Sequence, residues 1–143
     1  MIDDKLFVTA FIADIHFGAS RADSLYLQLR TYFINKLEKY PVDMIVFGGD
    51  MFHNVITMNY TTSYTVLLFM EEVLETCAKM GIKYVRIIQG TVSHDNNQLH
   101  NFRMFENRTD VNFKIIMNVA EETLEEGIRI LYLPEEYMDN PEE

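Results

Sequence analysis

The sequence "VDMIVFGGD", residues 42–50, is typical of a buried strand that ends abruptly in a charged residue. Its apolar run is stopped by two glycines, which allow a sharp turn before the aspartate. Similar apolar runs stand on either side of it, "KLFVTAFIAD" at 5–14 and "IKYVRIIQG" at 82–90. Each of the three runs predicts a strand in the interior of a sheet.

The segments between these runs have helical spacing. In residues 23–39 and 62–80, apolar residues recur every three or four positions, which predicts one helix in each segment. Strands and helices that alternate in this way predict an α/β fold, with a mainly parallel sheet and flanking helices. A short helix is expected near 98–106, followed by a strand-rich end. Its predicted strands are 113–119, 121–126 and 128–134.

The composition is that of one domain, with 143 residues and a formal net charge of −10. This charge argues against a general nucleic-acid binder, unless bound cations invert the local field. Cys77 is the only cysteine, which excludes an internal disulfide. No apolar stretch reaches the roughly 18 residues of a membrane span. The acidic N-terminus is unlike a secretory signal, so a cytoplasmic protein with no membrane partner is expected.

Polar side chains follow each of the three central strands. The ends of parallel strands meet at one edge of a sheet, where α/β proteins bind their ligands. Each cluster alone has a structural explanation, such as a turn or a helix cap, but together they predict one site. Mixed carboxylate and imidazole ligands suit Mn²⁺, Fe²⁺ or Zn²⁺. The residues are Asp14 and His16, which should point the same way in extended backbone, then Asp50 and His53, then His94 and Asp95.

In their order and spacing, "DIHFG" at 14–18, "GGDMFHN" at 48–54 and "SHD" at 93–95 resemble the calcineurin-like metallophosphoesterases. The histidine three residues after the aspartate of "GGD" is most similar to the SbcD-like DNA double-strand-break repair nucleases. The resemblance covers residues 6–105. It implies a four-layer α/β/β/α fold and a metal-dependent phosphodiesterase that acts on DNA, as an exonuclease or endonuclease.

The resemblance also implies metal ligands. Asp14 and His16 would bind a first ion, Asp50 would bridge two ions, and Mn²⁺ is the expected metal. Ser93 stands where the family has an asparagine that binds the second ion. A serine hydroxyl is shorter and a poorer ligand than an amide oxygen, and a nearby asparagine, Asn96 or Asn97, is the alternative to it.

Three catalytic roles follow from the same resemblance. His94 would give a proton to the leaving group, and Asp95 would orient His94. His53 would contact the scissile phosphate or assist that proton transfer. An imidazole suits such a role because its ordinary pKa lies near neutrality. His100 lies outside the motifs and is expected on a helix surface.

The family has further histidines later in its sequence, whereas this sequence has none after His100. The resemblance therefore implies that residues 1–143 are the N-terminal part of a metallophosphoesterase domain, truncated at its C-terminal end. Two other functions stay open: a phosphatase or cyclic-nucleotide phosphodiesterase, and an inactive interaction module.

The predicted helix 62–80 is apolar on every face around 65–70. It is expected either to be deeply buried or to form a homodimer contact. DNA is the expected substrate, and an ATPase is a further partner that the resemblance suggests.

Overall fold

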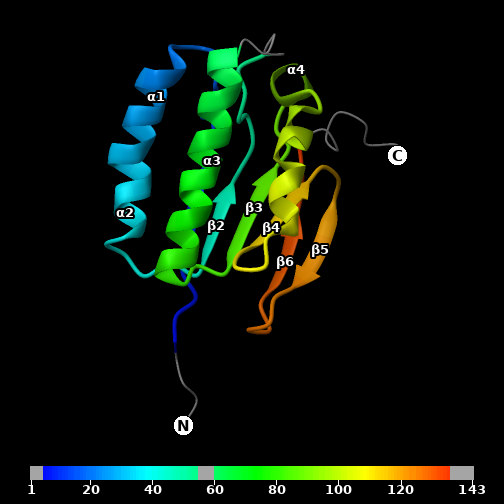
Figure 1. The fold of residues 1–143 in the computed structure, drawn as a ribbon. Coiled ribbons are helices and arrows are strands. Elements are labelled where there is room, and N and C mark those ends of the chain that lie inside the picture. The colour runs from blue at the N-terminus through cyan, green and yellow to red at the C-terminus, as the bar shows by residue number, and fades with distance from the viewer. Residues whose placement is uncertain (1–4, 55–59, 136–143) are drawn as a thin grey trace.

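The computed structural model describes residues 5–54 and 60–135. Its centre is a four-stranded sheet in which all neighbouring strands are parallel and the spatial order follows the chain (Figure 1). This confirms the predicted α/β fold with a parallel sheet. The strands are β1 (Thr9–Ile12), β2 (Met44–Phe47), β3 (Tyr84–Ile88) and β4 (Asn112–Ile116).

Helices cover one face of this sheet (Figure 1). The first crossover is one continuous helical stretch in which a single π-helical turn interrupts the α-helix. The predicted boundaries agree with the observed ones to within two residues at most ends. The helical elements are α1 (Ala22–Leu29), the π-helical η1 (Arg30–Ile34), α2 (Asn35–Leu37), α3 (Tyr60–Met80), α4 (Val92–Asp95) and the 3₁₀-helical η2 (Gln98–Asn107).

The core between the sheet and the helices is rich in aromatic rings. Phe69 of α3 is fully buried, and its ring centroid lies 5.6 Å from that of Phe17 and 6.0 Å from that of Phe47. Alternate residues of β2 and β3 point into this core, as the period of a strand requires. Close packing of this kind fixes the position of each strand end relative to its neighbours.

Helix α3 buries a broad apolar stripe rather than its whole circumference. Its buried residues include Val66, Phe69, Met70, Val73, Leu74 and Cys77. Tyr64 is 54% exposed, so the N-terminal half of the helix also presents an aromatic side chain to solvent. In the described residues, no helix is both long and apolar enough to cross a membrane.

The opposite face of the sheet is covered by an antiparallel hairpin of β5 (Ala120–Thr123) and β6 (Arg129–Tyr132). Its turn contains Gly127, whose φ of 81° is a conformation that glycine adopts without strain. Leu124 and Tyr132 pack with Met44 in a second, smaller core. The described residues therefore form three layers: helices, parallel sheet and hairpin.

A buried ion pair ties the hairpin to the sheet. The Arg86 side chain, on β3, is fully buried, and its guanidinium donates two hydrogen bonds to Glu122, at 2.6 and 3.1 Å. Tyr132 and Lys114 also donate to Glu122, at 2.6 and 3.1 Å. Burial alone would raise the pKa of Glu122, but the hydrogen bonds from Arg86 and Tyr132 outweigh burial and lower it to about 2. Glu122 is therefore held as a carboxylate.

Candidate metal centre

The first two polar clusters are joined by backbone hydrogen bonds beyond the ends of β1 and β2. The N–H of His16 donates to the carbonyl of Asp50 at 3.0 Å, and the N–H of His53 donates to the carbonyl of Phe17 at 2.9 Å. Phe17 and Phe52 form a further parallel bridge, and both rings are buried. The two clusters therefore lie side by side at the carboxyl edge of the sheet.

Three of the predicted metal ligands have left-handed backbone. The φ angles of Asp14, His16 and Asp50 are 55°, 54° and 50°. The prediction of extended backbone from Asp14 to His16 is wrong, because β1 ends at Ile12 and the chain then coils. Non-glycine residues adopt this conformation at a cost, and such residues concentrate at functional sites.

The coiled backbone brings the side chains of Asp14, His16 and Asp50 together. One ligand atom from each lies within 4.8 Å of the other two. His16 Nε2 is 3.8 Å from a carboxylate oxygen of Asp14 and 4.0 Å from one of Asp50. Two carboxylates and an imidazole in one place can bind a divalent cation of the Mn²⁺, Fe²⁺ or Zn²⁺ kind. We call these three residues the carboxylate group.

A cleft of about 450 Å³ opens beside this group. Asp14 and Asp50 line it together with Phe11, Gln89 and Glu135. Asp14 presents 73% of its side chain to solvent and Asp50 only 15%. An ion held between these two carboxylates would therefore be reached from the cleft.

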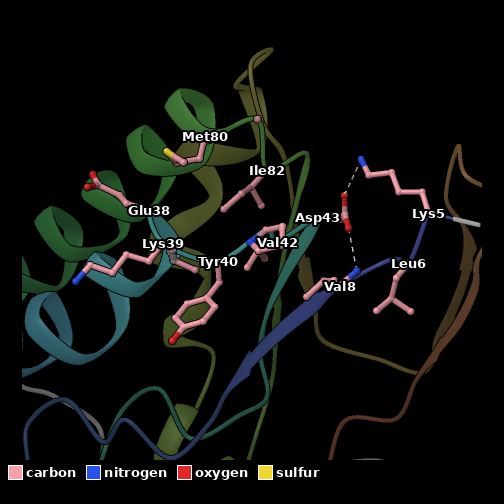
Figure 2. A pocket seen from close by; sticks show the side chains of 13 residues that line it. Lys5, Leu6, Val8, Glu38, Lys39, Tyr40, Val42, Asp43, Met80 and Ile82 are labelled. Carbon is pink, nitrogen blue, oxygen red and sulfur yellow. Dashed lines mark hydrogen bonds and ion pairs between the residues drawn. The ribbon is translucent and has the colours of Figure 1, made fainter.

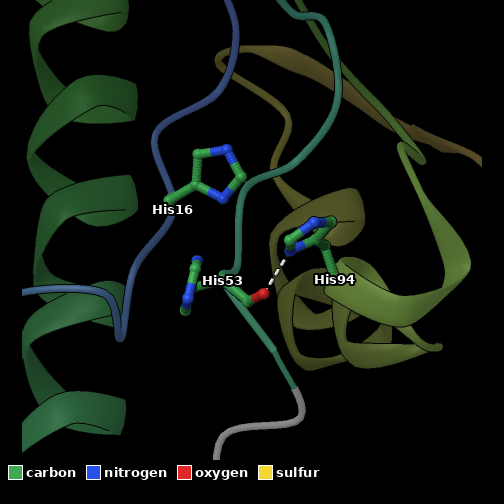
Figure 3. Close-up of side chains that lie close together, drawn as sticks. All are labelled: His16, His53 and His94. Atoms are coloured by element: carbon green, nitrogen blue, oxygen red, sulfur yellow. Dashed lines mark hydrogen bonds between the residues drawn. The ribbon is translucent and has the colours of Figure 1, made fainter.

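The histidines of the three clusters form a second group (Figure 3). The ring centroids of His16, His53 and His94 are 5.0 to 5.6 Å apart, and one ring nitrogen of each lies within 4.8 Å of the other two. The Nδ1 atom of His94 makes a hydrogen bond to the carbonyl oxygen of His53. A carbonyl oxygen only accepts, so Nδ1 of His94 carries the hydrogen and its Nε2 has a free lone pair.

Asp95 is fully buried and connects the loops that follow β2 and β3. Its carboxylate accepts hydrogen bonds from the N–H groups of Gly90 (2.7 Å), Phe52 (3.1 Å) and Asp50 (3.2 Å). Burial raises the pKa of Asp95 above its ordinary value, although the backbone hydrogen bonds oppose the shift. The expected contact with His94 is not among the hydrogen bonds of residues 5–54 and 60–135, so the direct orienting role of Asp95 stays a prediction.

Gly90 allows these loops to approach each other closely. A Cβ atom at this position would lie 2.3 Å from the backbone nitrogen of Asp50 and 2.4 Å from its Oδ1. Any larger residue would push Asp50 away from Asp14 and His16. The glycine after the third strand is therefore part of the geometry of the site.

Thr91 is a site residue that the sequence reasoning missed. Its N–H donates to Oδ1 of Asp50 at 2.8 Å, and its hydroxyl lies 3.4 Å from Oδ2 of Asp50 and 3.1 Å from a carboxylate oxygen of Glu135. Ser93, the predicted ligand, is exposed on α4. The signal that could have identified Thr91 is its place directly after Gly90, in the loop that follows β3.

The remaining histidine lies outside both groups. His100 is exposed on η2, and its Nδ1 accepts a 2.9 Å hydrogen bond from Arg103. This agrees with its predicted place on a helix surface.

A second hollow, of about 530 Å³, lies at the amino ends of β1 and β2, where Figure 2 shows its side chains. Two of its charged groups pair with each other: Lys5 lies 3.8 Å from Asp43, which also accepts a 2.8 Å hydrogen bond from the N–H of Val8. The clustered metal-ligating side chains of the described residues are all at the opposite end of the strands.

No family model matches this chain, and no curated protein matches it.

Proposed function

We propose that the chain carries the core of a metal-dependent phosphodiesterase site that acts on DNA, as in the SbcD-like repair nucleases that its motifs resemble. The observation that carries the proposal is the carboxylate group lying directly beside His94 and His53. A group that can bind a cation, next to imidazoles that can transfer protons, provides what hydrolysis of a phosphate ester requires. The proposal includes the four-layer α/β/β/α fold, of which the parallel sheet and the hairpin would be the two inner layers.

The fit of a divalent ion is supported by the donor set. Asp14 and Asp50 provide negative charge at the cleft, and His16 provides a nitrogen. A bound Mn²⁺ would supply Lewis acidity and neutralise phosphate charge. It would also reconcile a substrate as acidic as DNA with a chain whose formal charge is −10. Three protein ligands give modest affinity, so we expect weak binding of Mn²⁺ by residues 1–143.

His94 is placed to move a proton. Its Nδ1 is occupied by the carbonyl of His53, so its Nε2 is the atom that can carry a proton to a departing oxygen. His53 is exposed, as a residue that contacts a phosphate from solution must be. Asp95 positions His53 and His94 indirectly, because its carboxylate accepts hydrogen bonds from the backbones of the two loops that carry them.

Two other functions must be distinguished from the proposed one by experiment, because one fold can serve many activities. They are a phosphatase or cyclic-nucleotide phosphodiesterase on the same scaffold, and an inactive module that uses α3 for assembly. The exposed Tyr64 keeps a homodimer contact through α3 among the proposals. A partner ATPase and a cytoplasmic location belong with the nuclease proposal.

The test is hydrolysis with Mn²⁺ by the product of the complete reading frame, with single-stranded DNA and p-nitrophenyl phosphate as alternative substrates. We expect cleavage of DNA, loss of cleavage in Asp50→Asn, and no loss in Asp23→Asn. Asp23 is a suitable control because it is an exposed carboxylate paired with Arg21 at 2.7 Å, outside the site. Cleavage of the small ester alone would indicate a phosphatase, and cleavage of neither would favour the interaction module.

A further inference from the structure

The three clustered histidines form a donor set of their own, separate in chemistry from the carboxylate group. They come from three loops that follow β1, β2 and β3, and their side chains lie close together (Figure 3). A tetrahedral Zn²⁺ with ligands at about 2.0–2.1 Å places its nitrogens roughly 3.3 Å apart. The nitrogens here already lie within 4.8 Å of one another, so small rotations of the side chains would close the set around an ion.

Two of the rings have nitrogens prepared to bind a metal. His94 donates Nδ1–H to a backbone carbonyl, which is the contact that usually fixes a metal-binding histidine with its Nε2 lone pair free. The Nδ1 atom of His16 is buried and has no hydrogen-bond partner within residues 5–54 and 60–135. A buried polar atom without a partner is costly unless a ligand satisfies it.

We propose that His16, His53 and His94 form a nitrogen-only site for Zn²⁺, and that occupation of this site excludes a cation from the carboxylate group. Three imidazoles favour zinc and its neighbours in the transition series, whereas mixed oxygen ligands suit Mn²⁺. We call the three residues the histidine group.

The exclusion follows from His16, which belongs to both groups. A neutral imidazole has one nitrogen lone pair to offer a metal, because the other nitrogen carries a hydrogen. Nε2 of His16 lies 3.8 Å and 4.0 Å from Asp14 and Asp50, and Nδ1 is the buried atom without a partner. His16 therefore serves one group at a time. This part of the inference rests on the proposed function, since Zn²⁺ in the histidine group would also occupy His53 and His94 and stop hydrolysis.

The binding test uses Co²⁺ as a spectroscopic substitute for Zn²⁺, with the 143-residue chain. Four-coordinate Co²⁺ absorbs visible light much more strongly than six-coordinate Co²⁺, so the spectrum reports which group is occupied. We expect an intense spectrum at one equivalent of Co²⁺, removed by one equivalent of Zn²⁺. His53→Ala should abolish it and weaken Zn²⁺ binding by at least ~100-fold, since loss of a mere partner of a ligand costs roughly 10–100-fold. His53 is exposed, so this variant should keep its fold.

Two further variants make the result decisive. His100→Ala removes the chain's only other histidine and should leave the spectrum and the Zn²⁺ affinity unchanged. Asp14→Asn disables the carboxylate group and should also leave the intense spectrum in place. An intense spectrum that survives in His53→Ala, or one that disappears in Asp14→Asn, would overturn the histidine group as the site.

The inhibition test separates this inference from the proposed nuclease activity. Zn²⁺ added at one equivalent to the Mn²⁺-supported enzyme should abolish DNA cleavage, and a chelator selective for zinc should restore it. If Co²⁺ binds as described but no DNA is cleaved under any condition, the proposed function fails and the metal site stands. If DNA is cleaved and His53→Ala keeps the Co²⁺ spectrum, the proposed function stands and the inference fails.

Discussion

The backbone N–H of Thr91 donates a 2.8 Å hydrogen bond to Oδ1 of Asp50, and so connects the loop after β3 with the central carboxylate of the site. The same carboxylate has its second oxygen 4.0 Å from His16 Nε2. Asp50 is thus fixed by a hydrogen bond at Oδ1, while its Oδ2 has a longer contact of 3.4 Å with the Thr91 hydroxyl and lies near His16. This division of roles makes it the residue on which metal binding should depend most.

Asp50→Asn should abolish measurable Mn²⁺ binding with little change in thermal stability. The amide oxygen can still accept the hydrogen bond from Thr91, while the negative charge that attracts the cation is lost. Calorimetry with Mn²⁺ measures the first effect and thermal denaturation the second. Asp23→Asn, an exposed carboxylate outside the site, should bind Mn²⁺ like the parent chain. Equal Mn²⁺ affinity in both variants would remove Asp50 from the ligand set.

His94→Ala should lower the rate of DNA cleavage by about 10²–10⁴-fold at saturating Mn²⁺, because general acid catalysis contributes that much. The Mn²⁺ affinity should stay near that of the parent, since His94 is not in the carboxylate group. The matched control is His100→Ala, whose rate should not change. A parallel loss of Mn²⁺ affinity and rate in His94→Ala would show that His94 is a ligand of Mn²⁺ rather than the general acid of the reaction.

Thr91→Asn should tighten Mn²⁺ binding several-fold, whereas Ser93→Asn should have no effect. The side chain of Thr91 already lies 3.4 Å from Oδ2 of Asp50, so an amide oxygen at this position can reach an ion bound there. Ser93 is exposed on α4. Calorimetric titration of the two variants in parallel is the measurement. Tighter binding in Ser93→Asn alone would show that position 93, and not position 91, corresponds to the metal-binding asparagine of the family.

Glu122→Gln should destabilise the fold by about 3 kcal/mol at neutral pH, because Arg86 would lose its charged partner in a buried setting. The pKa of Glu122 is lowered to about 2 in the folded chain, from an ordinary value of 4.5. Its stabilisation is therefore present above pH ~5 and is lost as the pH falls through about 2. Urea unfolding as a function of pH should show the two proteins converging in acid.

The control for this variant is Glu121→Gln, on the outward face of the same strand. Glu121 pairs with Arg129 at 2.5 Å, but the two side chains are 53% and 75% exposed. Exposed pairs contribute little, so the change should be within about 0.5 kcal/mol at every pH. An equal effect at both positions would show that burial of the Arg86–Glu122 pair is not what matters.

The order of strands and helices was predictable because it depends on local apolar periodicity. The parallel sheet and the meeting of three polar clusters at one edge follow from that order alone. The contacts of Arg86 were not predictable, since its partner Glu122 lies far along the chain and nothing local marks the pair. A charged residue such as Arg86 in a strand suggests an exposed position, and only the hairpin packed over it makes it buried.

Within the site, residue types were easier to predict than backbone. Asp14, His16 and Asp50 do converge, but through left-handed backbone rather than through the pleat of a strand. The role of Thr91 depends on a main-chain N–H, which no residue type reveals. The mutual approach of His16, His53 and His94 depends on how three loops fold back, and spacing within each motif does not specify it.

The buried carboxylate of Asp95 has a consequence for how the site meets its ligands. The carboxylate accepts hydrogen bonds from three N–H groups of two loops, and so holds those loops in place through protein contacts alone. The scaffold is thus preorganised, so that capture of the proposed ion would require little reorganisation of the main chain. Amide exchange at Gly90 and Phe52 should accordingly be slow in metal-free protein and should hardly slow further when the metal is added. Asp95→Asn replaces one of the two acceptor oxygens by a donor. The loops would then be less ordered in the metal-free protein, and binding would have to meet the cost of ordering them.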